Sequence, residues 1–399
     1  MIQRTKQILM MTLVGLLFTL TGCGGGGETR AVTTTKVGGV ASKGIISGGT
    51  VNIYALDANG AKTGPPLATT TTESDGTYSA DLGSYSGPVK VEVTGTYTDE
   101  ATGLPVTIGT NNPMRAMAAG VFPRTAPFSA TVSPLTDLAV SSLPTSFNTT
   151  AITAANAQIS GLFKVSDITT VKPVAPTKIA MDGATTDQQA YTLALATVSQ
   201  MAKTNSGGAT PTFTQVTTVL TDINTELKAT PTELTNTAKK FTDGLTEVTK
   251  PGAKLTGYTA ANAVLGTVGV APLKLTLAVA NAGAYSVQGD IVLPLGSSVR
   301  IVNTVTTVVA KDLLGGIFTA GSGAAGAYTQ ATLTPPSGLI LGFVHFNVVT
   351  TGGFTGTDVA TLIIDVSSST TKAADFILKN VKVTDVNSAA VASPQVTLK

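Results

Sequence analysis

Side chains that could do catalytic chemistry are few in this sequence. His345 is the only histidine among 399 residues, and it lies in the alternating segment 341–348, on the same strand face as Phe343 and Asn347. A Ser-His-Asp arrangement is conceivable because serines and aspartates are numerous, but no Gly-x-Ser-x-Gly elbow accompanies the histidine. A structural His345 is therefore the favoured interpretation, and a hydrolase is the less favoured function.

Metal and carboxylate chemistry find equally little support. A His-x-x-x-His zinc pair is excluded because the sequence has no second histidine. Asp358, Asp365 and Asp375 lie in the last part of the chain, but a carboxylate pair that cleaves glycosides needs a cleft with a polar and aromatic lining. The sequence has no tryptophan. We therefore predict no enzyme activity, no catalytic residue, no metal and no cofactor.

The remaining reactive side chain is Cys23, the only cysteine of the chain, which excludes a disulfide framework. Arg4 and Lys6 form a basic start, and residues 8–20 are mostly apolar. An apolar run of about 13 residues suits a signal peptide, whereas spanning a bilayer takes about 20. A transmembrane anchor is the alternative.

The segment Leu20-Thr21-Gly22-Cys23 resembles the bacterial lipobox, in which the cysteine is acylated after the signal peptide is cleaved. The resemblance implies that residues 1–23 are a lipoprotein signal peptide with its lipobox, and that Cys23 is the lipidation site that attaches the chain to a membrane. Gly24 after the cysteine implies the outer membrane of a Gram-negative cell, on either the surface or the periplasmic face. Residues 24–36, rich in glycine and threonine, are predicted to be a flexible tether.

The composition argues against a nucleic-acid partner and favours a β-rich structure. Charged residues make up 12% of the chain, against about 25% in ordinary soluble domains. Lys and Arg number 25 against 23 Asp and Glu, so no basic field exists to hold nucleic acid. A hydrophobic content of 42% is enough for packed cores, and the many Thr and Val residues favour strands.

Residues 37–110 are predicted to form a small antiparallel β-sandwich, because short alternating segments are separated by turn residues. This block resembles a carboxypeptidase-regulatory-like, prealbumin-type domain in three places: residues 48–53, 71–78 and 87–93. The matching motifs consist mostly of residues that form turns, so the resemblance says more about the fold than about the function.

Two acidic turns in this block could contribute oxygen ligands to Ca²⁺. They are Asp57 with Asn59, and Glu73 with Asp75. A calcium site takes six or more oxygen ligands, and the same residue types are typical of simple turns. The turn interpretation is favoured.

Residues 111–265 are predicted to be a helical domain. Ser133-Pro134 is typical of an N-cap followed by Pro at the first helical position, and two pairs are typical of capping boxes: Thr185 with Gln188, and Thr230 with Glu233. Apolar side chains recur at helical spacing in three stretches, around residues 191–202, 213–227 and 234–248. These stripes could bind a partner, but mutual packing of neighbouring helices is favoured.

Residues 271–399 return to alternating strands, the clearest being 273–279, 290–294, 298–309, 339–349, 359–366 and 374–387. This block resembles a cohesin-type jelly-roll sandwich, which is also similar to some carbohydrate-binding modules. The matching features are residues 286–290, the Gly- and Ala-rich stretch 315–327, and residues 376–387. Cohesins dock partner modules through a sheet face. Because this chain has no Asp-x-Asp-x-Asp-Gly loop, a dockerin-like partner would be another chain.

Sugar binding is the alternative use of such a sandwich. With tryptophan absent, Tyr285 and Tyr328 are the candidate stacking side chains of the last block, although tyrosines more often serve a core or rim. The predicted fold is mainly β with an α-helical middle. The predicted function is that of a non-enzymatic, lipid-anchored envelope protein whose sandwiches bind a protein or an extracellular polymer, the alternative being a carbohydrate-binding accessory lipoprotein.

Overall fold

The computed structural model describes residues 33–294, 297–299, 307–309, 318–334 and 341–399. The predicted signal peptide, Cys23 and most of the predicted tether lie outside these residues. The end of that tether already belongs to the folded part, because Thr35 is fully buried and makes two backbone hydrogen bonds. Its N–H donates to Gly83 O at 2.8 Å, and its carbonyl oxygen accepts from Leu82 N at 2.7 Å. The prediction that the flexible tether extends to residue 36 is therefore wrong for Thr35 and Lys36, and Lys36 begins the first strand. No helix in the described part of the chain is long and apolar enough to cross a bilayer.

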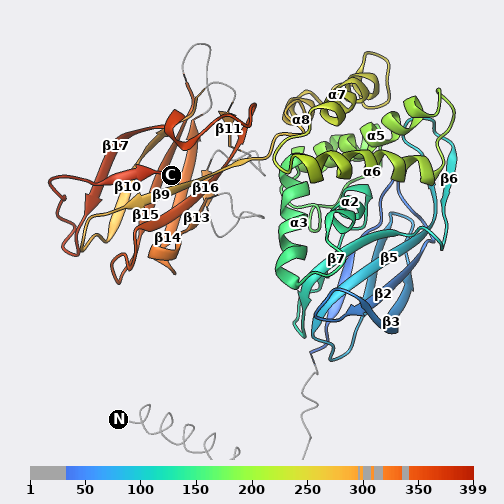
Figure 1. Ribbon diagram of the computed structural model, residues 1–399, viewed down its shortest axis with the longest axis horizontal. Coiled ribbons are helices and arrows are strands. Elements are labelled where there is room, and N and C mark those ends of the chain that lie inside the picture. Colours follow the sequence, from blue (N-terminus) through green and yellow to red (C-terminus); the bar gives the residue numbers. More distant parts are fainter. Residues whose placement is uncertain (1–32, 295–296, 300–306, 310–317, 335–340) are drawn as a thin grey trace, which may run out of the picture. The chain divides into compact units, whose positions relative to one another are not determined.

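The first sandwich consists of two sheets (Figure 1). The smaller one has the order β4 (Thr77–Asp81), β1 (Lys36–Val40), β8 (Phe128–Ser129). The larger one contains β3 (Lys62–Thr71), β2 (Thr50–Leu56), β5 (Gly87–Thr98), β6 (Pro105–Ile108) and β7 (Met114–Val121). All pairs are antiparallel except β1 with β8.

Strands continue past residue 110, where the sequence predicted that helices begin. The segment β7 is rich in Ala and Met, which favour helices in isolation. It nevertheless pairs with β5 from Met114↔Val93 to Val121↔Gly87, which buries Met114 and Ala116. Tertiary pairing thus overrides the local preference, and the first described helix begins only at Pro134.

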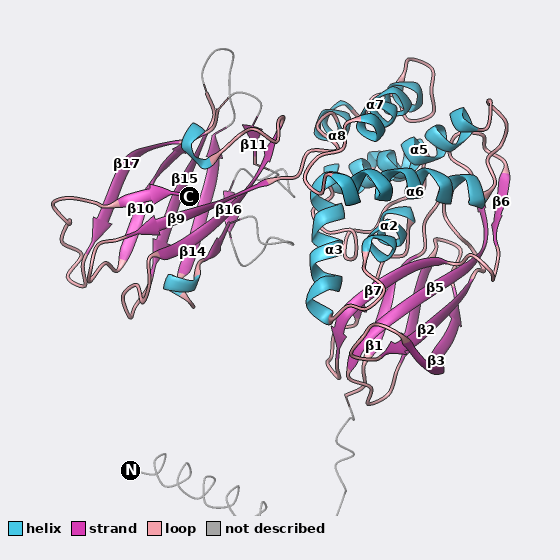
Figure 2. Cartoon of the chain, in the orientation of Figure 1, coloured by secondary structure: helices cyan, strands magenta, loops and turns pink. Residues whose placement is uncertain are grey.

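The helical part contains seven described helices (Figure 2). Their bounds are α2 (Pro134–Ser142), α3 (Thr149–Leu162), α4 (Lys178–Asp182), α5 (Thr186–Asn205), α6 (Phe213–Ala229), α7 (Asn236–Thr249) and α8 (Thr259–Leu265). Two predicted helix starts are confirmed: Ser133 caps α2 with Pro134 at its first position, and Thr185 forms a capping box with Gln188 on α5.

The capping box predicted at Thr230 and Glu233 was wrong. Thr230 instead follows the last turn of α6, and its N–H donates to Glu226 O. The next helix, α7, begins at Asn236, and its N-cap Thr235 makes no side-chain cap bond. The carboxylate of Glu226 on α6 takes that role, accepting from the N–H groups of Thr235 at 2.6 Å, Asn236 at 2.8 Å and Thr237 at 2.9 Å. Because the capping carboxylate belongs to the neighbouring helix, the residues at the start of α7 contain no capping motif that could predict it.

One hydrophobic core is shared by the first sandwich and the helices. It extends along the chain from Val37 to Val268, and α2 and α3 pack against β7 (Figure 1). Tyr191 of α5 is fully buried in this core, where its hydroxyl hydrogen-bonds Ser133 Oγ at 2.6 Å and donates to Ile168 O at 3.1 Å. The predicted boundary at residue 110 therefore does not coincide with a break in the core.

The second sandwich has its own core, formed by residues from Val270 to Val383. One sheet has the order β12 (Thr307–Val309), β14 (Tyr328–Thr334), β15 (Phe343–Val349), β10 (Ser286–Val292), β17 (Ile377–Thr384). The other contains β11 (Ser297–Ser298), β16 (Asp358–Val366), β9 (Leu273–Val279), β18 (Val396–Leu398) and β13 (Phe318–Ala320), which pairs with β16. The predicted fold class, mainly β with a helical middle, is confirmed.

Candidate binding face

The second sandwich presents a regular outward face on the sheet β12-β14-β15-β10-β17. Side chains alternate along β10, where Val287 and Ile291 are buried and Gln288 and Asp290 are partly exposed. They also alternate along β15, where Val344, Phe346 and Val348 are buried. The face is therefore made of every second residue of four neighbouring described strands. We call this surface the outer face.

Two polar rows cross the middle of the outer face. The strand register places Gln330, Asn347, Gln288 and Lys382 opposite one another in the first row. It places Thr332, His345, Asp290 and Lys379 in the second. Amide side chains both donate and accept hydrogen bonds, so the first row offers both kinds of group to a molecule lying across the strands.

His345 and Asp290 are hydrogen-bonded within the second row. Nδ1 of His345 lies 2.7 Å from Oδ1 of Asp290, and Asn380 Nδ2 donates to Oδ2 of the same carboxylate at 2.6 Å. Asn380 adopts a φ of +53°, and the register between β10 and β17 shifts between Gln288 and Asp290. Partial burial raises the pKa of Asp290, but the hydrogen bonds from Asn380 and His345 outweigh it, so the pKa lies below its ordinary value.

Apolar side chains border the polar rows on both sides. At one end, exposed Tyr328 lies opposite exposed Val349. At the other end, exposed Ile377 lies opposite Val292, which lies opposite Phe343. A shallow hollow of about 410 Å³ lies there, lined by Asp290, Val292, Leu341, Phe343, Lys379 and Asn380. Exposed apolar residues that cluster around a polar centre indicate an interaction site, whereas single exposed apolar residues are common on any protein surface.

The described residues of the outer face do not form a Ser-His-Asp or Cys-His arrangement. His345 is more than half exposed, at 55% of its side chain, and no serine or cysteine of the described chain is hydrogen-bonded to its other ring nitrogen. The predicted strand face shared by Phe343, His345 and Asn347 is confirmed. The sequence could not indicate Asp290 as the partner, because the two residues meet only through the pairing of β10 with β15.

The three aspartates considered for glycoside cleavage have separate partners. Asp358 forms a 2.6 Å ion pair with Lys399, and Asp365 forms one of 3.2 Å with Lys164. Asp375 Oδ2 accepts from the backbone N–H of Lys372. Within the described ranges, no group of three or more His, Cys, Asp or Glu side chains could hold a metal ion.

The two candidate tyrosines do not form a row on one sheet face. Tyr328 lies on the outer face and is 48% exposed. Tyr285 directly precedes Ser286, an outer-face residue, so it has the opposite parity, and its ring packs close to Gly353, where an added Cβ would come within 3.1 Å. A planar tyrosine platform is thus not formed by these two residues.

The acidic turns of the first sandwich stabilise their own backbone. Asp57 Oδ1 accepts from the N–H groups of Asn59 and Ala61, each at 2.9 Å. Asp75 Oδ1 accepts from the hydroxyl and the N–H of Thr77, and these bonds lower the pKa of Asp75. Both geometries are those of turn residues.

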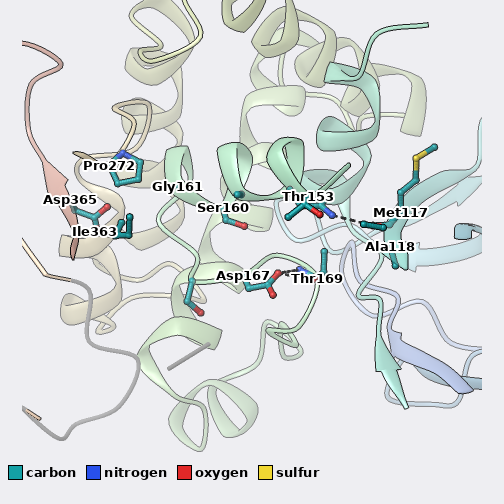
Figure 3. A pocket seen from close by; sticks show the side chains of 14 residues that line it. Met117, Ala118, Thr153, Ser160, Gly161, Asp167, Thr169, Pro272, Ile363 and Asp365 are labelled. Carbon is teal, nitrogen blue, oxygen red and sulfur yellow. Dashed lines mark hydrogen bonds between the residues drawn. The ribbon is translucent and has the colours of Figure 1, made fainter. Parts of the chain in front are cut away.

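A cavity of about 530 Å³ is another concave feature of the described part of the chain (Figure 3). Its lining includes Met117 of β7, Ser160 and Gly161 of α3, Asp167, and Pro272, Ile363 and Asp365. Two of the polar groups in the lining are already hydrogen-bonded to the backbone. Ser160 Oγ accepts from Ile168 N at 3.1 Å, and Asp167 Oδ1 accepts from Thr169 N at 2.8 Å. The cavity therefore offers mainly apolar surface.

Comparisons with known proteins add one structural likeness. No family model matches the chain, and no curated protein sequence matches it. Among solved structures, the chain is similar to a non-cellulosomal cohesin from the hyperthermophilic archaeon Archaeoglobus fulgidus, with 12% sequence identity and a TM-score of 0.19. The alignment covers 30% of this chain and 69% of the cohesin. A TM-score this low does not establish a shared fold. The assignment of a β-sandwich to residues 271–399 is based on the strand pairing described above.

Proposed function

We propose that this chain is a non-enzymatic protein of the bacterial cell envelope, held to the outer membrane by lipid on Cys23, and that the outer face of its second sandwich binds a protein partner. The observation that carries the proposal is the pair of polar rows between two apolar borders. Interfaces of this kind combine apolar anchors with polar groups that fix orientation.

A protein partner is favoured over a polysaccharide by the chemistry of the outer face. Sugar rings are recognised mainly by stacking on aromatic planes, and Tyr328 is the single tyrosine that the described strands place there. The amides of Gln288, Gln330 and Asn347 can instead pair with the backbone or polar side chains of a protein. The sequence resemblance to cohesins, which dock partners through a sheet face, agrees with this choice.

The experiment compares two substitutions to arginine in the full-length protein, each followed by cross-linking in intact envelopes and affinity capture. Asn347→Arg puts a bulky charge in the middle of the outer face. Thr276→Arg on β9 is the matched control, because Thr276 is a half-buried strand residue of the other sheet. We expect Asn347→Arg to weaken capture of the partner about tenfold or more, which corresponds to about 1.4 kcal/mol, and Thr276→Arg to leave it unchanged.

Two outcomes would count against the proposal. Equal capture by both variants would show that the outer face is not the binding surface. Retention on an extracellular glycan that Tyr328→Ala abolishes, without any captured protein, would favour the carbohydrate-binding alternative instead.

A further inference from the structure

Four polar side chains form a buried cluster between the first sandwich and α5. They are Lys43, Asp99, Glu100 and Ser199. The side chains of Lys43 and Asp99 are fully buried, and that of Glu100 is 2% exposed. Lys43 Nζ lies 2.5 Å from Glu100 Oε2 and 3.9 Å from Asp99 Oδ2, and it also hydrogen-bonds Ser199 Oγ. Charged side chains are almost never buried this completely without a specific use or partner.

The backbone brings Lys43 to the carboxylates through a close approach at Gly44. Gly44 has a φ of +61°, and an added Cβ would meet the carbonyl oxygen of Thr98 at 2.1 Å. Its N–H donates to Oε1 of Glu100 at 2.7 Å. The carboxyl group of Glu100 is therefore held from both sides, by an N–H on one oxygen and by Lys43 on the other.

Tyr97 and α5 close the cluster off from solvent. Lys43 Nζ lies 5.4 Å from the centroid of the Tyr97 ring, and Nζ also approaches Leu195 O of α5 at 3.5 Å. The hydroxyl of Tyr97 is buried without a hydrogen-bond partner among the described residues. Burial, followed by the negative charges of Glu100 and Asp99, raises the pKa of Tyr97.

The cluster buries three formal charges while its side chains stay separate. One ammonium faces two carboxylates in a site from which water is excluded. Burying an ion pair is costly because both ions lose their hydration, and only good geometry offsets the cost. Joining the ammonium to the carboxylate of Glu100 as an amide would remove two of these charges and leave the carboxylate of Asp99, which accepts hydrogen bonds on both oxygens.

We propose that Lys43 and Glu100 condense into an intramolecular amide bond. Lys43 Nζ first passes one proton to Glu100 Oε2. The neutral Nζ then attacks Cδ of Glu100, forming the N–C bond, while the negative charge that develops on Oε1 is stabilised by the N–H of Gly44. A proton leaves Nζ to Ser199 Oγ as the hydroxyl proton of Ser199 passes to Oε2. The Cδ–Oε2 bond breaks, and Oε2 departs as water. One ammonium and one carboxylate thus give one amide and one water, without an oxidant or any co-reactant.

Proximity and burial favour this condensation, which does not occur between the same groups in water. Holding the reacting groups in contact replaces a bimolecular encounter, and excluding water strengthens the polar contacts inside the site. The exposed pairs Lys178–Asp182 and Lys239–Asp243, each at 2.8 Å, have similar distances but full access to water. They are therefore internal controls that should stay unlinked.

Glu100 is the acyl partner because Asp99 is already occupied. Asp99 Oδ1 accepts from Ala101 N at 3.1 Å, Thr102 N at 3.0 Å and Thr102 Oγ1 at 2.9 Å. Its other oxygen accepts from Ser199 Oγ at 2.7 Å. Asp99 is thus a positioning residue that holds Ser199 beside the reacting groups.

The amide would tie two loops that lie 57 residues apart in the sequence. Peptide mapping of the full-length protein purified from membranes tests for it directly. Trypsin does not cleave after an acylated lysine, so the linked form releases residues 37–62 joined to residues 91–115, at the summed mass of the two peptides less one water. We expect this species to account for most of the material. Separate peptides 37–43, 44–62 and 91–115 at full mass would overturn the proposal, and fragment ions that place the bond on Asp99 would overturn the assignment to Glu100.

Two variants sharpen the test. Lys43→Met, which keeps a long buried side chain but has no amine, should lose the linked species, and its persistence would contradict the assignment. Ser199→Ala should form the linked species several-fold more slowly than the wild type after refolding. Equal rates would remove Ser199 from the proton transfer. The peptide map of the wild-type protein decides the main question even where a variant does not fold.

Discussion

Nδ1 of His345 lies 2.7 Å from Oδ1 of Asp290, and the two side chains form one row of the exposed sheet face. His345, the only histidine in the sequence, is thus paired with an aspartate. It orients the imidazole on an open surface between Thr332 and the strand that carries Asp290. The geometry suits recognition of a partner, and the partner contact is the role that we propose for it.

The substitution His345→Gln tests that role against catalysis. Because the histidine is 55% exposed, loss of its bond to Asp290 should change the free energy of unfolding by less than about 1 kcal/mol. Urea unfolding measures this change, and assays with ester, peptide and glycoside substrates measure turnover. A hydrolytic activity of the wild type that disappears in His345→Gln would contradict a non-enzymatic function.

Glu226 supplies a prediction for the pH dependence of stability. Partial burial raises its pKa, but hydrogen bonds from the Thr237 side chain and from the N–H groups of Thr237, Asn236 and Thr235 together lower the pKa to about 2, from an ordinary 4.5. A carboxylate whose pKa is lower in the folded state stabilises that state fully above its ordinary pKa. This contribution is lost as the pH falls from about 4.5 towards about 2.

Glu226→Gln should therefore destabilise the protein at pH 7 by about 1–2 kcal/mol, as expected for loss of a helix cap. The difference between variant and wild type should shrink as the pH falls below 4.5. Glu247→Gln, in an exposed pair with Lys250 at the other end of α7, is the control and should cost less than about 0.5 kcal/mol. A difference that stays constant down to pH 2 would contradict the assigned cap.

The lipid attachment at Cys23 is tested by Cys23→Ala. Several acyl chains on one residue hold a protein firmly to a membrane, whereas a chain without them has no such anchor. We expect the wild type in the membrane fraction, with a mature N-terminus at acylated Cys23, and the variant outside it. Mass spectrometry of a mature protein with an unmodified thiol, or with another N-terminus, would remove the anchor from the account.

The sequence predicts correctly those helices and strands that are determined by residues close together in the chain. Strict alternation located residues 273–279, which form β9, and cap chemistry located Ser133 and Thr185. The sequence pattern does not predict β14, although this strand pairs with the next strand along the chain, β15. It places β7 in the helical part, because the Ala- and Met-rich sequence of β7 favours a helix and only pairing with β5 makes it a strand.

The sites were less predictable than the elements for the same physical reason. Parity alone placed His345 and Asn347 on one face, but the rows that complete the outer face require the register of four strands. Lys43 has the sequence context of an ordinary surface lysine. Only the fold brings it to Glu100 and Ser199, beneath a helix more than 150 residues further along the chain.

The most direct test of the proposed function is site-specific photo-cross-linking in living cells. A photoreactive phenylalanine analogue replaces Asn347 on the outer face in one version of the full-length protein and Thr276 on the other sheet in the control. We predict a discrete cross-linked protein band from position 347 that is absent from position 276. Bands of equal intensity from both positions, or no band from position 347, would contradict a partner-binding role for the outer face.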